Sequence, residues 1–442
     1  MSKLLSISPL TGRYRDKIQE LEQHTSEYAL LKFRIEVEVE YIIALSEIGL
    51  VKLSQGEKNK LLNLVKNFSL KDAEKIKDIE GKTNHDVKAI ELFLRNYLPE
   101  KSAEMLHFGI TSEDINNIAY RLMLRSASEG IIIPILNELL RFLISNSRKY
   151  KNIPMLGRTH GQPAVPTTVG KEFAVFASRL GSELEKLNKI QLTGKLNGAI
   201  GNYNALSLAY PKIDWLKFGK SFVKSFDLEP NLITTQVNSN EDIVEYFQTI
   251  QRINGILLDL NQDMWRYISD GWFVQKNEKG QVGSSTMPQK INPIDFENSE
   301  GNLELANGLI EVFTRELPVS RLQRDLSNST IIRNIGTVLG YSLISYKSCL
   351  TGLSKISPNS ELITHDLNSN WSILSEALQT ILRMEHKKDA YHKALELTKG
   401  KKLNQKDWQN LVQGLEILSS NKEKLLKLTP STYLGLAKKL IR

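Results

Sequence analysis

Residues 246–267 read YFQTIQRINGILLDLNQDMWRY, and apolar side chains recur through this stretch at alternating spacings of four and three residues. Such spacing places one apolar stripe along a helix, which is typical of helices that pack against other helices. Only Gly255 weakens this helical pattern. The stretch predicts a long helix inside a bundle, with a stripe made of Tyr246, Ile250, Ile253, Leu257, Leu260, Met264 and Tyr267.

Helical spacing recurs in the rest of the chain. Residues 28–43 and 173–190 each carry an apolar stripe. A further long helix is expected over residues 111–151, with a kink at Pro134. Only residues 231–237 resemble a short extended segment. The sequence therefore predicts an all-α fold dominated by long helices.

Two turn signals divide the 442 residues, a length that exceeds one ordinary hydrophobic core. The first is Pro99 and the second is the cluster SPNS at residues 357–360. We expect three helical domains, namely an N-terminal domain at 1–100, a central long-helix bundle at 101–353 and a C-terminal domain at 354–442.

The net charge of +8 raises the question of nucleic acid as a partner. The last 42 residues carry nine Lys and Arg against three Asp and Glu, and these are spread through a helical pattern without interleaved aromatic residues. A solvated helix face explains that distribution, so no nucleic-acid partner is expected. A surplus of positive charge would instead favour small anionic substrates.

The chain shows no sign of export or membrane insertion. No apolar run approaches the roughly 20 residues that span a bilayer, and the start MSKLLSISPL is not a secretory signal. The single cysteine, Cys349, lies in an apolar run where core packing is expected and cannot form an internal disulfide. A cytosolic protein without a membrane partner is predicted.

A polar loop interrupts the helical pattern at residues 283–293, GSSTMPQKINP. Glycines and prolines in and just before it exclude a helix. Within a few residues it offers the hydroxyls of Ser284 and Ser285, the cation of Lys290 and the amide of Asn292. The alternative to a functional loop is a solvated linker.

Two further polar segments combine reactive side chains. Residues 157–164, GRTHGQPA, open the following helix and set His160 between a hydroxyl and a glycine, although a lone histidine is more often structural. Residues 111–117, TSEDINN, place Thr111 and Asp114 at capping-box spacing. A helix N-terminus with hydroxyls also binds carboxylates, and the paired asparagines of this segment need partners if they are buried.

Metal and cofactor sites lack support in the sequence. The seven histidines show no paired i, i+4 spacing with a carboxylate, and there is one cysteine. The chain has neither a GxGxxG motif nor a phosphate-binding loop that ends in Gly-Lys-Ser/Thr. Cofactor-free acid–base chemistry is therefore predicted.

The three polar segments together resemble the signature segments of the fumarase/aspartase superfamily. Residues 283–293 match the superfamily pattern GSSxMPxKxNP at every fixed position. Within that superfamily the chain is similar to the adenylosuccinate lyase family over nearly its whole length. The further matching segments are GRY at 12–14, TNHDV at 83–87, TTQ at 234–236 and the stretch 320–333. The implied fold is a long-helix bundle that packs into a multi-subunit helical core.

The resemblance implies a β-elimination in purine nucleotide biosynthesis. Adenylosuccinate would lose fumarate to give AMP, and succinylaminoimidazole carboxamide ribotide would lose it to give the carboxamide ribotide. The family's base is the first loop serine, which maps to Ser284, although Ser285 is left open. His160 is suited to protonating the leaving amine. Lys290 and Asn292 fit the stabilisation of the developing negative charge.

Residue matching also implies the substrate contacts, with no cofactor and no metal. Arginine recognises phosphate through paired hydrogen bonds, so the contacts implied at the nucleotide end are Arg13, Tyr14, Arg324, Ser329 and Arg333. The pair implied near the transferred proton is His85 and Asp86, which follow Asn84. The other implied substrate ligands are Thr111, Ser112, Gln236 and Asn298, besides Lys290 and Asn292.

Two alternatives to this enzyme stay open. Gln289 fills a loop position where argininosuccinate lyases often have glutamine, which makes that family the main rival. A non-catalytic structural member of the superfamily is the other alternative, although such a protein would not need Ser284, His160 and Lys290 together.

The spacing of the segments predicts active sites that are shared between subunits. About 35 helical residues between TSEDINN and GRTHGQPA would span roughly 50 Å. A small substrate cannot touch both ends of such a helix, so a second chain must supply one of them. The resemblance adds a homotetramer in which three chains contribute to each site.

Overall fold

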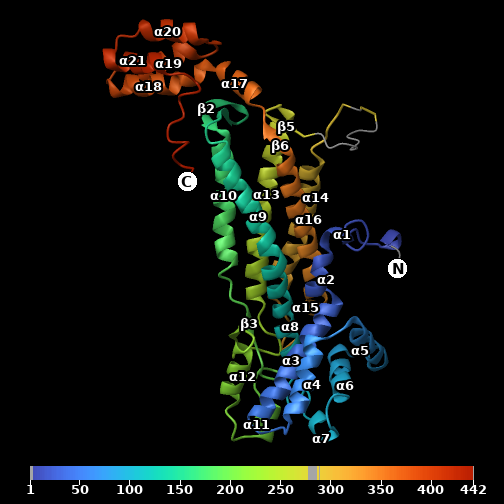
Figure 1. Ribbon diagram of the computed structural model, residues 1–442. Coiled ribbons are helices and arrows are strands. Elements are labelled where there is room, and N and C mark those ends of the chain that lie inside the picture. Colours follow the sequence, from blue (N-terminus) through green and yellow to red (C-terminus); the bar gives the residue numbers. More distant parts are fainter. Residues whose placement is uncertain (1–2, 277–285, 288, 442) are drawn as a thin grey trace. The chain divides into compact units, whose positions relative to one another are not determined.

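Helices make up most of the chain in the computed structural model, which describes residues 3–276, 286–287 and 289–441 (Figure 1). The predicted all-α class is confirmed. From the N-terminus the helices are η1 (Lys3–Leu5), α1 (Arg15–Ile18), η2 (Gln19–Leu21), α2 (Glu22–Thr25), α3 (Glu27–Glu47), α4 (Gln55–Lys66), α5 (Leu70–Thr83), α6 (Asp86–Arg95), α7 (Glu100–Ala103), α8 (Ser112–Ala127), η3 (Ser128–Ile132) and α9 (Ile133–Lys149).

The second part of the chain continues in the same way. Its helices are α10 (Val169–Leu187), α11 (Asn204–Ala209), α12 (Trp215–Lys224), α13 (Glu241–Ser269), α14 (Ile294–Glu316), α15 (Ser327–Ile332), α16 (Ile335–Lys355), α17 (Ser360–Asn368), η4 (Trp371–Leu374), α18 (Ser375–Met384), α19 (Ala390–Thr398), α20 (Gln405–Gln413) and α21 (Ser419–Lys427). No helix in the described part of the chain is both long and apolar enough to cross a membrane.

Short strands pair into two-stranded sheets. The antiparallel pairs are β1 (Pro154–Thr159) with β2 (Gln162–Thr168) and β5 (Phe273–Gln275) with β6 (Ile356–Pro358). The parallel pair is β3 (Thr193–Gly194) with β4 (Glu229–Pro230).

The extended segment predicted at 231–237 is wrong, because these residues form no strand in the structure. Their side chains bond to nearby backbone instead: Thr234 Oγ1 donates to the Thr235 carbonyl at 2.9 Å, and the Val237 N–H donates to Thr235 Oγ1 at 3.3 Å. Such local bonds compete with strand pairing.

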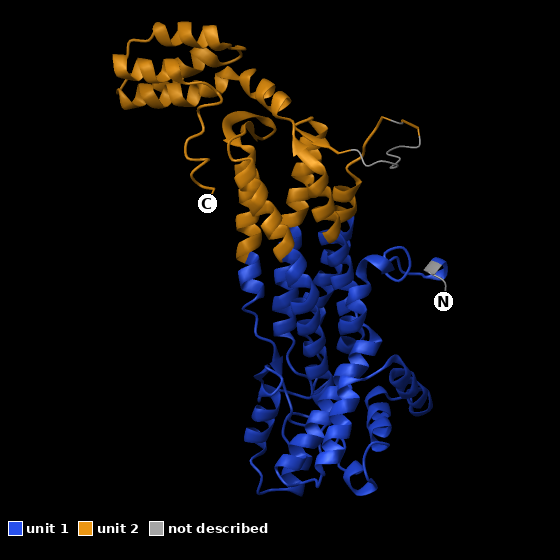
Figure 2. Ribbon diagram, viewed as in Figure 1, with its two compact units in different colours: residues 1–136, 183–255, 301–346 blue, residues 137–182, 256–300, 347–442 orange. Residues whose placement is uncertain are grey.

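The chain divides into two compact units (Figure 2). The first unit comprises Met1–Leu136, Glu183–Gly255 and Gly301–Tyr346, and the second comprises Asn137–Ser182, Ile256–Glu300 and Lys347–Arg442. Each unit gathers segments that are distant in the sequence. The three-domain division by sequence boundaries stays a prediction.

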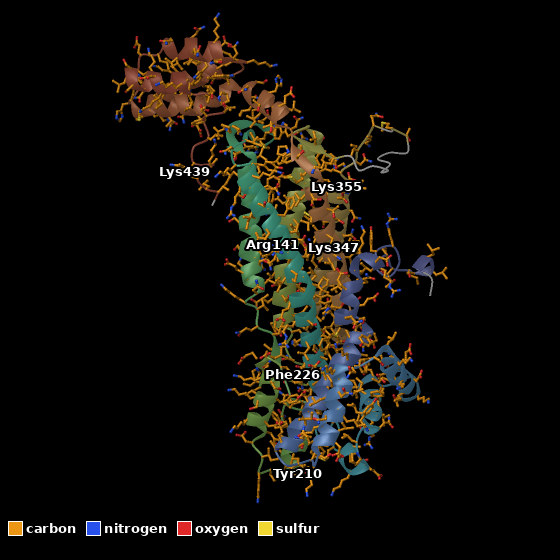
Figure 3. The ribbon with its side chains drawn as sticks, viewed as in Figure 1. Arg141, Tyr210, Phe226, Lys347, Lys355 and Lys439 are labelled. Carbon is orange, nitrogen blue, oxygen red and sulfur yellow. The ribbon has the colours of Figure 1, made fainter. Side chains whose placement is uncertain are left out.

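The core of the first unit is built around α3, which packs against α4, α5, α6 and α8. Tyr41 of α3 meets an aromatic group on α12, with its ring centroid 5.7 Å from that of Phe222. Phe226, labelled in Figure 3, extends this group at 5.3 Å from Phe222. In the second unit, Trp408 is fully buried and donates from its indole nitrogen to the Leu425 carbonyl at 2.9 Å.

The predicted apolar stripe belongs to α13. Its first six members are buried, and Tyr267 is half-buried. Cys349 of α16 is also buried, as predicted, and burial raises the pKa of its thiol to about 12.

The predicted helix at 111–151 runs from Ser112 to Lys149 as α8, η3 and α9. Its irregularity is a π-helical turn, η3, that ends at Ile132, two residues before Pro134. A proline ring clashes with the carbonyl four residues earlier, here that of Gly130, and a wider π turn relieves such a clash.

Candidate active site

The first unit places the segment around His85 at the start of α6. Asn84 takes a left-handed conformation, with φ of 54°, and ends α5. His85 caps α6 by accepting the Lys88 N–H on Nδ1 at 3.2 Å. With Nδ1 occupied as an acceptor, Nε2 is the ring nitrogen left for another partner.

Asp86 lies at the centre of a group that we call the Asp86 cluster: Glu27, Arg34, Asp86, Asn116 and Arg333. Asp86 Oδ2 accepts from Arg34 Nη2 at 2.7 Å and from Arg333 Nη2 at 3.0 Å. Arg333 Nη1 also donates to Glu27 at 3.2 Å. Burial alone would raise the pKa of Asp86, but Arg34 and the other donors hold that pKa below its usual value. Asp86 is therefore ionised.

The TSEDINN segment begins α8 as predicted. Thr111 and Asp114 form a capping box, in which the Thr111 N–H donates to Asp114 at 2.8 Å. Asp114 also pairs with Lys195 at 3.0 Å, and both side chains are fully buried. Asn116 and Asn117 are buried and have hydrogen-bond partners: Asn116 accepts from Arg34 at 2.8 Å, and Asn117 accepts the backbone N–H of Lys195 at 2.8 Å.

A second cluster gathers around Arg324, and we call it the Arg324 cluster: Glu113, Gln236, Arg324 and Ser329. Arg324 donates to Gln236 Oε1 at 3.0 Å and to Ser329 Oγ at 3.5 Å. It also pairs with Glu113 at 3.4 Å. Burial raises the pKa of Glu113, and Arg324 only partly offsets that effect.

Arg13 and Tyr14 lie in the turn before α1, also in the first unit. The guanidinium carbon of Arg13 is 6.0 Å from the centroid of the Tyr14 ring, and the Tyr14 N–H donates to the Pro9 carbonyl at 2.8 Å. Arg13 is exposed and Tyr14 is half-buried. Both side chains can therefore be reached by a ligand.

The second unit carries His160 at the tip of the β1–β2 hairpin, not at the start of a helix as predicted. His160 and Gly161 form a two-residue turn with φ of 53° and 72°. Positive φ at both positions is the geometry that connects twisted strands in a tight hairpin. His160 is exposed there. Near the tip of the hairpin, Arg158 pairs with Asp366 at 3.2 Å and lies over the Trp272 ring at 5.2 Å.

The loop that precedes α14 is described only in part. Ser284 and Ser285 lie outside the described residues, whereas Lys290 is exposed and its N–H donates to the Met287 carbonyl at 3.1 Å. Asn292 is half-buried. Asn298 of α14 accepts a hydrogen bond from Ser348 Oγ at 2.8 Å.

Comparison with known proteins identifies the family of this chain. The Lyase family model matches residues 12–307, and the Adenylosuccinate lyase C-terminal model matches residues 320–434. Adenylosuccinate lyase of Haemophilus influenzae is 44% identical over 450 residues, with 100% of this chain and 99% of the relative covered. That of Escherichia coli (strain K12) is 43% identical over 446 residues, with 99% and 98% covered. The chain belongs to the adenylosuccinate lyase family.

Solved structures agree on the fold of this family member. The fumarate lyase from Mesorhizobium sp. BNC1 superposes with a TM-score of 0.77 at 18% identity, and 96% of each chain is covered. The β-carboxy-cis,cis-muconate cycloisomerase from Acinetobacter calcoaceticus sp. ADP1 gives a TM-score of 0.76 at 19% identity, with 97% of this chain and 98% of that chain covered. At such low identity these structures bear on the fold alone.

Three residues of the clusters in this adenylosuccinate lyase family member were not predicted from the sequence, and one of them is Glu27, which pairs with Arg333 at 3.2 Å. Arg34 joins the Asp86 cluster and Glu113 joins the Arg324 cluster. A signal for Arg34 was available, because a cation interrupts an otherwise apolar helix face between Leu31 and Ile35. Glu113 lies inside a recognised segment but looks like an ordinary first-turn acid.

The described residues hold no group of three or more His, Cys, Asp or Glu side chains that could bind a metal ion. What the first unit does assemble is a set of arginines held by carboxylates and amides near hydroxyls. Such a set can bind a phosphorylated, polyanionic ligand.

Proposed function

We propose that the protein eliminates fumarate from adenylosuccinate to give AMP, and from succinylaminoimidazole carboxamide ribotide to give the carboxamide ribotide. The observation that carries the proposal is full-length similarity to adenylosuccinate lyases, 44% over 450 residues for the Haemophilus influenzae enzyme. The two arginine clusters support it, because both substrates combine a phosphate with two succinyl carboxylates.

In the proposed elimination, the Ser284 alkoxide takes a proton from the CH2 carbon of the succinyl group. This carbon is bonded to the carbon that carries the leaving nitrogen. The electron pair forms the new double bond, the carbon–nitrogen bond breaks, and His160 gives a proton to the leaving nitrogen. Charge that develops on the succinyl carboxylate is met by Lys290 and Asn292. The products are fumarate and AMP from adenylosuccinate, or fumarate and the carboxamide ribotide from the second substrate.

The other predicted residues are proposed as substrate contacts. Arg13, Tyr14, Arg324, Ser329 and Arg333 would hold the nucleotide end. His85 and Asp86, with Asn84 beside them, would lie near the transferred proton. Further substrate contacts would come from Thr111, Ser112, Gln236 and Asn298.

We also propose a cytosolic homotetramer in which three chains complete each site. Thr111 lies in the first compact unit and His160 in the second. The spacing of the segments in the sequence supports the shared site, because about 35 helical residues between TSEDINN and GRTHGQPA would span roughly 50 Å.

The proposed activity has a direct assay. Purified protein is mixed with adenylosuccinate, and ultraviolet absorbance is followed while AMP and fumarate are identified by chromatography. Argininosuccinate and fumarate serve as control substrates. No change with adenylosuccinate at micromolar protein would overturn the proposal, and cleavage of argininosuccinate alone would reassign the substrate.

A further inference from the structure

Arg34 is a cation in the core of the first unit. It lies within α3, and its side chain is only 1% exposed. A buried guanidinium loses its hydration, and an apolar side chain of similar size is often at least as stabilising in such a position. Stability of the fold is therefore a weak reason for an arginine at this place.

The contacts of Arg34 point toward the proposed substrate-binding residues. Nη2 donates to Asp86 Oδ2 at 2.7 Å and Nε donates to Asn116 Oδ1 at 2.8 Å. Within the described part of the chain, Nη1 has no hydrogen-bond partner. Arg34 thus ties α3 to the first residue of α6 and to the first turns of α8.

Asp86 is shared between two arginines. The same oxygen that accepts from Arg34 also accepts from Arg333 Nη2 at 3.0 Å. The other oxygen, Oδ1, accepts the Val87 N–H at 2.8 Å. Arg34 is buried whereas the Arg333 side chain is 40% exposed, so Arg333 is the arginine that a ligand can reach.

Because Asp86 pairs with both Arg34 and Arg333, Arg34 lowers the free-energy cost of moving Arg333 to a bound anion. If Arg333 turns from Asp86 to a phosphate, Asp86 keeps Arg34 as its counter-ion. Without Arg34, Asp86 would have Arg333 as its one arginine among the described residues, and turning Arg333 away would leave a half-buried carboxylate without an arginine partner.

We propose that Arg34 is a positioning residue: by holding Asp86, it leaves the Arg333 guanidinium available to the phosphate of the nucleotide. This inference rests on the proposed function, because the phosphate contact of Arg333 is part of it. Arg34 itself does not touch the substrate.

The test compares Arg34→Met and Arg34→Lys with a matched control, Arg121→Met. Arg121 of α8 is also 1% exposed and pairs with a buried carboxylate, Asp242, at 2.8 Å. It lies outside the proposed contacts. For each variant, thermal unfolding and affinities for AMP and for adenosine, which lacks the phosphate, are measured by calorimetry.

Arg34→Met is expected to weaken AMP binding by about tenfold, which is a factor that one charge-assisted contact can account for, with little change for adenosine. Arg34→Lys should restore part of the preference for AMP because it keeps the charge. Arg121→Met should lower the unfolding temperature but leave the ratio of AMP to adenosine affinity as in the wild type. A native ratio in Arg34→Met would overturn the inference.

A double-mutant cycle with Arg333→Met tests whether Arg34 acts through Arg333. The loss of AMP affinity caused by Arg34→Met should nearly vanish in the Arg333→Met background. A loss that persists in full would contradict the proposal, and Arg34→Lys supplies the same cycle if Arg34→Met does not fold. Failure of the proposed function is distinguishable, because the wild type would then neither cleave adenylosuccinate nor prefer AMP over adenosine.

Discussion

At the scale of single residues, the interior accepts charges that have matched partners. Lys195 and Asp114 pair at 3.0 Å with both side chains fully buried, and Arg121 and Asp242 pair at 2.8 Å in a similar setting. Removing one partner of such a pair leaves an uncompensated buried charge. The exposed reactive candidates, His160 and Lys290, have no buried charge partner to lose, although His160→Ala places an alanine at a left-handed turn position with φ of 53° and should cost about 1 kcal/mol.

The first prediction concerns the proton transfers. Ser284→Ala and His160→Ala should each lower turnover of adenylosuccinate at least about a hundredfold, because general acid–base groups act in the transition state. Binding of AMP should stay measurable by calorimetry, since the proposed phosphate contacts lie elsewhere. A His160→Ala variant with near-native turnover would contradict the proposal that His160 protonates the leaving nitrogen.

The second prediction separates the two ends of the substrate. Lys290→Ala should reduce kcat for adenylosuccinate more than it reduces affinity for AMP, because AMP has no succinyl carboxylate. Lys388→Ala, at an exposed position in the C-terminal part of the chain, is the control and should change neither value. Equal losses in kcat and AMP affinity would instead place Lys290 at the nucleotide end.

At the scale of elements, the β1–β2 hairpin holds His160 by close backbone contact. The register shifts between Leu156 and Arg158, so Gly157 occupies an irregular position in β1. A Cβ atom added at Gly157 would lie 2.4 Å from the Val165 carbonyl oxygen. Since that oxygen belongs to the opposite strand, it cannot move without shifting the hairpin.

The third prediction follows from this contact. Gly157→Ala should destabilise the protein by about 1–3 kcal/mol, as overpacking does, and should lower turnover through the displaced hairpin. Gly81→Ala is the matched control, since nothing lies within 4 Å of its added Cβ in α5. That variant should be neutral or slightly more stable in thermal unfolding. Native stability and turnover in Gly157→Ala would show that the hairpin tolerates the shift.

At the scale of the whole molecule, the proposed assembly would let different chains supply the TSEDINN and GRTHGQPA segments of one site. In the fourth prediction, one preparation is inactivated at His160 and another at Ser284, and the two are dissociated, mixed and reassembled. Activity should return, because some hybrid sites receive both native residues from different chains. Each variant reassembled alone is the control. Verified mixed oligomers without activity would count heavily against a shared site.

The sequence determined the class of fold and the family because both depend on the spacing of residues that are close together in the chain. The stripe from Tyr246 to Met264, the capping box at Thr111 and the motif at 283–293 depend on residues a few positions apart. The same spacing could not reveal the β1–β2 hairpin, because a two-residue turn at His160 and Gly161 resembles a helix entry until its strands pair. Roles assigned to Ser284, Lys290 and the other site residues stay predictions.

Only the tertiary structure decided which charges are buried together. Arg34 meets Asp86 across 52 positions of sequence and Asn116 across 82. In the sequence Arg34 only interrupts an apolar helix face, and nothing near it along the chain shows which residues it meets. Its role emerges when α3, α6 and α8 pack, because desolvation and pairing depend on neighbours in space and not on neighbours along the chain.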